Sequence, residues 1–175
     1  MKFTYLDTPI GSLLLAGRGT ALEILDFPNG KRPQHATTGW VCDEGAFADV
    51  RRQLGEYFAG KRRVFDVELA PHGTSFQLEV WSALRAIPFG ATRSYGDIAR
   101  AIRKPLASRA VGAANGSNPL PIIVPCHRVI GSNGALTGFG GGLPAKVFLL
   151  RLEGVTIPES AARIERQRAL FEPVS

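Results

Sequence analysis

The sequence predicts an α+β protein: a small N-terminal α/β unit with an antiparallel sheet, followed by a mostly helical C-terminal domain containing a helix-turn-helix. Short apolar segments separated by turn residues dominate the first 70 residues, whereas apolar residues at helical spacing dominate the chain after residue 74. A length of 175 residues is enough for one sizeable core or two small ones.

The N-terminal half contains three strand patterns and one helix pattern. Residues 3–6 and 13–16 flank the turn-rich sequence DTPIG, which predicts a hairpin, and residues 21–27 could add a third strand. Proline, glycine, threonine and asparagine dominate 28–39, as is typical of a loop. An amphipathic helix is expected over 46–59, ending at Gly60, and residues 64–69 alternate like one more strand.

Three helices are expected in the second half. Thr74 and Gln77 have the form of a capping box, and Pro88-Phe89-Gly90 ends the helix that follows. Ser94 can cap a second helix over 95–103, and a third is expected over about 106–115. The third helix is rich in small residues, which are Ala107, Ala110, Gly112, Ala113 and Ala114. This pattern favours a helix-turn-helix with Arg109 projecting from it, although a plain helical hairpin packed through alanines gives the same pattern.

These patterns divide the chain into an N-terminal α+β domain (1–70), a linker (71–75), a mostly helical domain with the helix-turn-helix (76–155) and a C-terminal tail (156–175). No apolar run reaches the roughly 20 residues that a membrane helix needs, and the N-terminus lacks the pattern of a secretory signal. We therefore expect a cytoplasmic protein without membrane association.

The net charge of +6 is concentrated in one part of the chain. Residues 91–152 contain eight Lys or Arg residues and one acidic residue, Asp97, whereas residues 1–90 contain ten of each sign. A segregated basic excess indicates a surface that binds a polyanion, and nucleic acid is the obvious candidate. A chance surplus on a solvated surface is the alternative.

Cys126 is the candidate nucleophile, because a proline precedes it and His127 and Arg128 follow it directly. Cationic neighbours and a partnering base favour the reactive thiolate, whereas an inert core thiol is the usual alternative. Adjacent side chains point apart, so His127 needs a relay to reach the sulfur, and Glu153 could orient its imidazole. A cysteine protease is disfavoured because its Cys and His are normally distant in sequence. Cys42 and His35 are too few for a structural zinc site, so no metal is expected.

The segment 76–154 resembles the catalytic domain of the O6-alkylguanine-DNA alkyltransferases, also called methylated-DNA–protein-cysteine methyltransferases. The N-terminal half is similar more loosely, in its DTPIG hairpin and in the Tyr57-Phe58-Ala59-Gly60 helix end. The motifs that carry the resemblance are Arg93-Ser94-Tyr95-Gly96, Ser108-Arg109-Ala110-Val111-Gly112, Gly116-Ser117-Asn118-Pro119, the run from Ile122 to Gly131 around Pro125-Cys126-His127-Arg128, and Leu152-Glu153-Gly154.

The resemblance implies a role for each site residue. Cys126 would accept the alkyl group once, activated through a water by His127, with Glu153 holding the imidazole. Tyr95 would donate to the departing base, and Asn118 would tie the helix-turn-helix to the active-site turn. The carbonyls of Cys126 and Val129, the N–H of Gly140 and the wall residue Phe139 would contact the base. On the DNA side, Arg109 would fill the gap left by the flipped nucleotide, Ala110 lies on the helix that enters the minor groove, and Ser132 would contact a phosphate.

The resemblance also implies the partner and the outcome. The partner is double-stranded DNA carrying O6-alkylguanine or O4-alkylthymine; no cofactor and no obligate protein partner are implied. The chain departs from relatives at Phe139, where they often carry Tyr, and in the glycines that follow it. Two rival functions are a non-catalytic lesion-binding relative, which would lack the cysteine, and a DNA-binding regulator. The relay and the basic surroundings predict a Cys126 pKa well below the roughly 8.5 of a free thiol.

Overall fold

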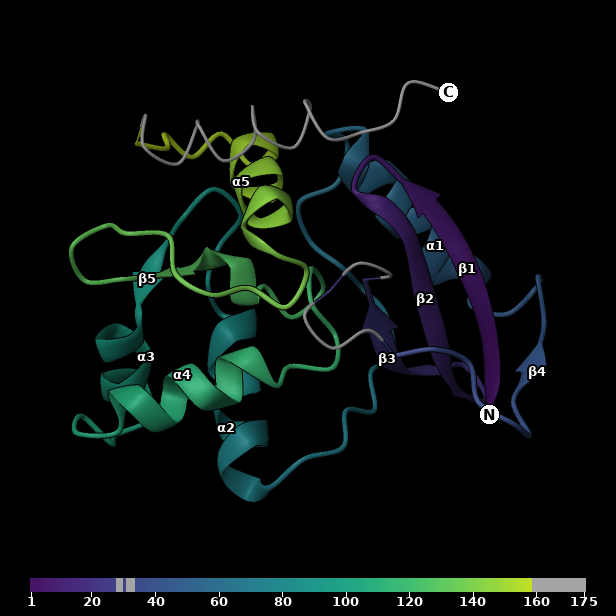
Figure 1. Cartoon of the computed structure of the whole chain (residues 1–175), viewed down its shortest axis with the longest axis horizontal. Helices are drawn as coiled ribbons and strands as arrows, with labels where there is room; N and C mark the ends of the chain where they lie inside the picture. The colour runs from purple at the N-terminus through teal and green to yellow at the C-terminus, as the bar shows by residue number, and fades with distance from the viewer. Residues whose placement is uncertain (28–29, 31–33, 159–175) are drawn as a thin grey trace.

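The structure is a computed structural model that describes residues 1–27, 30 and 34–158. Figure 1 shows the N-terminal sheet with its helix on one side of the molecule and the remaining helices on the other. Residues 28–29 and 31–33 of the expected loop, and the expected tail from residue 159 onward, lie outside the described residues. No helix in the described part of the chain is both long and apolar enough to cross a membrane.

A four-stranded sheet forms the N-terminal unit, in the order β3-β2-β1-β4. Strands β1 (Lys2–Thr8) and β2 (Gly11–Arg18) form the expected antiparallel hairpin, and β3 (Ala21–Asp26) is the expected third strand. The two-residue strand β4 (Val41–Cys42), parallel to β1, was not expected from the sequence. Because β2 is central, its residues from Leu13 to Gly17 are buried on both faces.

One helix, α1 (Ala48–Phe58), packs behind this sheet and confirms the predicted amphipathic helix (Figure 1). Its buried face contains Val50, Leu54 and Tyr57, at the spacing of one helical stripe. The strand expected over 64–69 is wrong. That segment makes only an isolated bridge between Leu69 and Leu22, because its backbone pairs with β3 at a single residue.

Three helices follow as the sequence predicts. They are α2 (Ser75–Arg85), α3 (Tyr95–Ala101) and α4 (Ser108–Gly116). The predicted capping box is present at the start of α2, where Thr74 and Gln77 bond reciprocally. The predicted cap Ser94 is also present, and it forms a second capping box with Asp97 at the start of α3. Helix α4 packs on α2, where the indole N–H of Trp81 donates to the carbonyl of Ala114 over 2.8 Å.

The end of the domain surrounds the cysteine. A short 3₁₀ turn, η1 (Cys126–Arg128), leads into β6 (Val129–Ile130), which pairs in parallel with β5 (Arg93–Ser94). The last described helix is α5 (Leu143–Leu152), and Glu153 is its C-terminal cap. One hydrophobic core runs through both halves of the chain, and the N–H of Leu25 in β3 donates to the carbonyl of Pro119. The N-terminal unit is therefore packed directly against the segment that leads to the cysteine.

Candidate functional site

Cys126 lies at the first position of η1 and is almost completely buried, with 4% of its surface exposed. The backbone before it makes a tight turn, in which the N–H of Val124 donates to the carbonyl of Leu120. Ile122, at the centre of this turn, has a φ of 75° and is wholly buried. A left-handed conformation is strained for a β-branched residue, so the surrounding packing must hold the turn in place.

Asn118 fixes the same turn from the end of the helix-turn-helix. Its side-chain N–H donates to the carbonyl of Val124 over 2.8 Å, and its side-chain oxygen accepts from the N–H of Leu120 over 3.0 Å. A hydrogen bond from Asn118 also favours the thiolate of Cys126. The residue therefore contacts both the backbone and the sulfur of the cysteine turn.

Hydrogen bonds from several parts of the chain converge on the carboxylate of Glu153. Oε1 accepts from His127 Nε2 over 2.7 Å, from the hydroxyl of Tyr57 over 2.7 Å and from Arg128 Nη2 over 3.0 Å. Oε2 accepts from Arg128 Nε over 2.8 Å and from the backbone N–H of Gly90 over 3.2 Å. Burial alone would raise the pKa of Glu153, but the hydrogen bonds from His127 and Arg128 hold it at about 2. The carboxylate is therefore ionised at neutral pH.

His127 is completely buried, and its ring orientation follows from this carboxylate. An ionised Glu153 can only accept, so Nε2 of His127 carries the proton that joins them. No group in the described part of the chain bonds to Nδ1, which is left as a buried acceptor. Burial lowers the pKa of His127, against the opposing effect of Glu153, and neighbouring Arg128 lowers it further. The imidazole is therefore neutral and has one free base site.

The expected low pKa of Cys126 is wrong for the resting protein, because burial raises that pKa to about 11. The cation expected to help, Arg128, is bound to Glu153 and donates its remaining Nη1 to the carbonyl of Ile87. The cation that does lower the pKa of the thiol is Lys146, on α5. Adjacency in sequence therefore pointed to the wrong cation.

Lys146 is wholly buried, and sequence reasoning missed it. Its ammonium donates to the carbonyl of Val129 over 2.5 Å and to the carbonyl of Thr137 over 2.8 Å. Burial lowers its pKa to about 8, against the opposing charge of Cys126. One signal could have found it: Lys146 interrupts an otherwise apolar stretch, residues 143–150, at a position that faces inward.

The segment between β6 and α5 forms a wall beside the cysteine. The hydroxyls of Tyr95 and Thr137 lie 2.9 Å apart in a hydrogen bond, so α3 holds this segment from one side. Phe139 is buried, and its ring contacts that of His127 at 6.4 Å between centroids. On the other side Phe139 meets Phe27, from the N-terminal unit, edge to face at 5.4 Å. This second aromatic partner was also missed.

The remaining expected contact groups lie near this wall. Gly140 is exposed beside Gly30 of the N-terminal unit, where a side chain on Gly30 would approach the Gly140 carbonyl to 2.8 Å. The carbonyl of Val129 accepts from Lys146, and that of Cys126 accepts from the N–H of Val129. A carbonyl oxygen has two lone pairs, so both carbonyls can accept a further hydrogen bond.

The outer face of α4 is small and basic. Arg109, Ala110, Ala113 and Gly116 are exposed at the spacing of one helical face, while Val111 and Ala114 point into the core. Such a face presents little obstruction to close approach by a surface, with one guanidinium near its start. Ser132 is also exposed, in the turn after β6.

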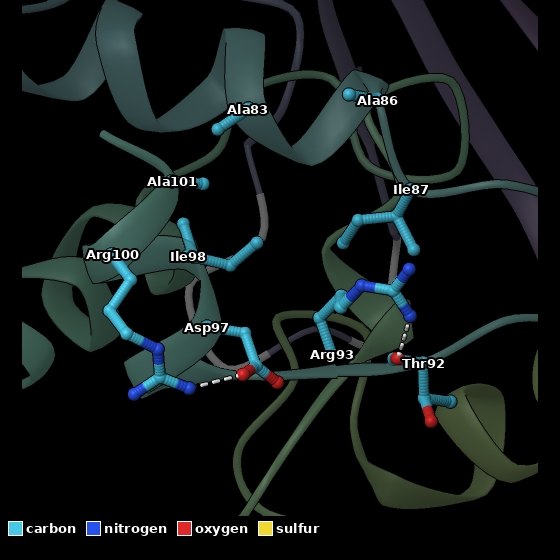
Figure 2. Close-up of a pocket in the computed structure, with 9 residues that line it drawn as sticks. All are labelled: Ala83, Ala86, Ile87, Thr92, Arg93, Asp97, Ile98, Arg100 and Ala101. Atoms are coloured by element: carbon cyan, nitrogen blue, oxygen red, sulfur yellow. Dashed lines mark hydrogen bonds and ion pairs between the residues drawn. The ribbon is translucent and has the colours of Figure 1, made fainter. Parts of the chain in front are cut away.

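A separate pocket of about 450 Å³ lies between α2, α3 and β5 (Figure 2). Its charged lining is internally paired, since Arg100 contacts Asp97 and Arg93 donates to the carbonyl of its neighbour Thr92. None of the residues that contact Glu153 or Cys126 lines it. We therefore place the candidate site at the cysteine and not at this pocket.

Comparison with known proteins adds the family context. Residues 1–71 match the family model for the 6-O-methylguanine DNA methyltransferase ribonuclease-like domain, and residues 75–155 match that for its DNA binding domain. The methylated-DNA–protein-cysteine methyltransferase of Methanosarcina acetivorans is 53% identical, over 88% of this chain and 99% of the relative. The protein of the same name from Mycobacterium tuberculosis is 53% identical, over 90% and 95% respectively.

A solved structure is similar over the same extent. The crystal structure of Mycobacterium tuberculosis OGT in complex with DNA has a TM-score of 0.83 and 52% identity, and it covers 87% of this chain and 92% of that one. Both halves of the chain, including the loosely similar N-terminal half, are therefore shared with proteins of one family.

The site generates a prediction about the thiol itself. In a Cys42→Ser protein, the ultraviolet absorbance of the Cys126 thiolate should appear with a midpoint near 11, because burial disfavours the anion. Subtracting the titration of a protein that also lacks Cys126 isolates the signal. A midpoint at or below that of an ordinary thiol would contradict this description of the resting site.

Proposed function

The chain belongs to the 6-O-methylguanine DNA methyltransferase family, and we propose that it repairs double-stranded DNA by moving the alkyl group of O6-alkylguanine onto its own Cys126. The combination of a buried thiol with an oriented imidazole supports Cys126 as the acceptor of the alkyl group. Cys126 is followed directly by His127, whose Nε2 is fixed by Glu153 and whose Nδ1 is a free buried acceptor. This arrangement can remove a proton from the thiol at the moment of attack.

The proposed reaction is a displacement at the alkyl carbon. The thiol proton of Cys126 passes through a water to Nδ1 of His127, and the sulfur forms a bond to the alkyl carbon. The bond between that carbon and O6 of guanine breaks, and its electron pair stays on the base. The hydroxyl of Tyr95 donates its proton to the departing guanine, which avoids release of a bare anion. The resulting tyrosinate takes up a proton from solvent, and His127 releases to solvent the proton that it accepted from the thiol. The products are an unmodified guanine and a thioether on Cys126.

The charges around the sulfur suit this sequence of steps. The resting thiol is neutral, and Glu153 stabilises the imidazolium as it forms on His127. Lys146 stabilises the developing thiolate, and its hydrogen bonds to the carbonyls of Val129 and Thr137 hold the wall beside it. We therefore add Lys146 to the residues that support transfer. The imidazolium–thiolate pair forms only transiently, which keeps the buried thiol unreactive between encounters.

The small face of α4 is the proposed contact with DNA. Its exposed alanines and glycine would allow close approach to the minor groove, and the exposed Ser132 would contact a phosphate. A stacked base cannot reach a buried sulfur, so the damaged nucleotide must leave the helix. Arg109 then fills the gap that the nucleotide leaves. Phe139 and Gly140 line the space that receives the base, and we expect O4-alkylthymine to enter it as well.

Two rival functions share this fold and differ in outcome. A lesion-binding protein without transfer chemistry, or a DNA-binding regulator, would bind the same duplex and leave the alkyl group on the base. The oriented His127 beside Cys126 favours transfer, since binding alone needs neither residue.

Intact mass spectrometry tests the function directly. After incubation with a duplex that carries O6-methylguanine, the protein should gain one methyl group on Cys126 and react once, because no residue near the thioether can displace it. The Cys126→Ala protein should bind the duplex without gaining mass, whereas the matched control Cys42→Ala should react like the unaltered protein. Binding without any mass gain in the unaltered protein would leave the two rival functions, and labelling of Cys42 would rule out the proposed acceptor.

A second measurement tests the role of Arg109. The Arg109→Ala substitution should slow transfer from duplex DNA far more than transfer from free O6-benzylguanine, by about tenfold or more, because a free base needs no extrusion. Arg85→Ala, which removes an exposed arginine from α2, is the matched control and should leave the ratio of the two rates unchanged. Equal losses on both substrates in the Arg109 protein would mean that this residue supports the fold and not extrusion.

A further inference from the structure

Tyr57 joins the N-terminal unit to the proposed relay. It lies in α1, 96 residues before Glu153 in the sequence, and its hydroxyl donates to Oε1 of that carboxylate over 2.7 Å. Both side chains are completely buried. Of the groups that donate to this carboxylate, Tyr57 is the member that comes from outside the catalytic domain.

The ring of Tyr57 is held by packing that does not involve its hydroxyl. Phe58 and Phe65 each lie 5.4 Å from it between ring centroids, and Phe89 lies at 6.2 Å. A phenylalanine at this position would keep these contacts. A buried hydroxyl costs free energy unless it finds a partner, and Glu153 is the partner that Tyr57 finds. The hydroxyl of Tyr57 therefore interacts with Glu153 and not with the aromatic cluster.

The oxygen that Tyr57 contacts is the one that holds the imidazole. Oε1 of Glu153 accepts from Tyr57 and from His127 Nε2 at the same distance, 2.7 Å. An acceptor that serves several donors offers less negative charge to each of them. Tyr57 therefore acts on the same atom through which Glu153 controls His127.

We propose that Tyr57 is a positioning residue of the transfer reaction: its hydroxyl holds Oε1 of Glu153 in place and shares its charge, so that the N-terminal unit completes the active site. This inference rests on the proposed function, in which His127 must be a neutral base when the substrate arrives. It assigns a role at the reacting centre to the N-terminal unit, in addition to the packing of Phe27 against Phe139 and the hydrogen bond from Leu25 to Pro119.

Removal of the Tyr57 hydroxyl should change the pKa of His127 in a definite direction. The charged groups that face this imidazole are Glu153, Arg128 and Lys146, with the Cys126 thiol beside it. Removal of the Tyr57 hydroxyl leaves more of the charge on Oε1 for His127, which stabilises the imidazolium. The pKa of His127 should therefore rise, and the base form should appear at a higher pH.

The test uses the full chain with Tyr57→Phe. We expect the midpoint of His127, followed by nitrogen NMR of the resting protein, to rise by about half a pH unit. The acid limb of the pH profile for the rate of transfer from free O6-benzylguanine should also move to higher pH. Transfer should therefore slow more at about pH 6, where more of the imidazole is protonated, than at about pH 8. The ratio of the transfer rates at these two pH values does not depend on the fraction of the protein that is folded, as long as that fraction is the same at both. Phe65→Leu, which disturbs the same aromatic cluster, is the control and should leave the midpoint unchanged.

A second probe keeps the test decisive if Tyr57→Phe does not fold. Replacing Tyr57 alone with 3-fluorotyrosine keeps the ring and makes the hydroxyl a stronger donor, so the His127 midpoint should fall. An unmoved midpoint in either folded protein would overturn the proposal. Failure of the proposed function is a separate result, because it would appear as no transfer by the unaltered protein, while the His127 titration stays readable.

Discussion

The buried carboxylate of Glu153 is the constraint on which the rest of the site depends. A buried charge that loses its partner costs about 3–5 kcal/mol, so a chain that places one in its core must satisfy it. The carboxylate and its partners come from four separate segments: Tyr57 lies in α1, Gly90 in the loop after α2, His127 and Arg128 in η1, and Glu153 itself caps α5. Satisfying this one group brings together parts of the chain that are distant in sequence. The same hydrogen bonds that hold the fold also fix the tautomer of His127.

The two buried cations, Arg128 and Lys146, act on different groups of the site. Arg128 neutralises Glu153, which limits how strongly that carboxylate can raise the basicity of His127. Lys146 faces Cys126 instead, yet burial still keeps the thiol protonated at rest. The result is a nucleophile that is formed on demand and not stored as a thiolate. This suits a protein that can react only once, because an exposed thiolate would be consumed by other electrophiles.

The sequence predicts local structure well and long-range contacts poorly in this chain. The DTPIG hairpin and the capping boxes at Thr74 and Ser94 are local patterns, and each is present in the structure. The strand expected over 64–69 fails because alternation cannot show whether a neighbouring strand is available to pair with it. At the site, the position of Cys126 beside His127 could be read directly, and Glu153 was a candidate for orienting the imidazole, a role that the resemblance also implies. Tyr57 and Phe27 could not be found, because their roles come from packing between segments that no spacing rule connects. Lys146 leaves a signal in the sequence as a charge within an apolar stretch, but that signal does not show which group the ammonium faces.

We infer that the charge of Glu153, acting through His127, drives the transfer. Replacing Glu153 alone would leave Arg128 as an unpaired buried charge, so the most direct measurement uses the double substitution Glu153→Gln with Arg128→Met, which removes both charges together. The quantity to measure is the rate constant for alkyl transfer from free O6-benzylguanine, in protein shown to be folded by its thermal transition. We expect a rate at least about a hundredfold below that of the unaltered protein, the usual size of a general-base contribution. A folded double variant that transfers at the unaltered rate would contradict it.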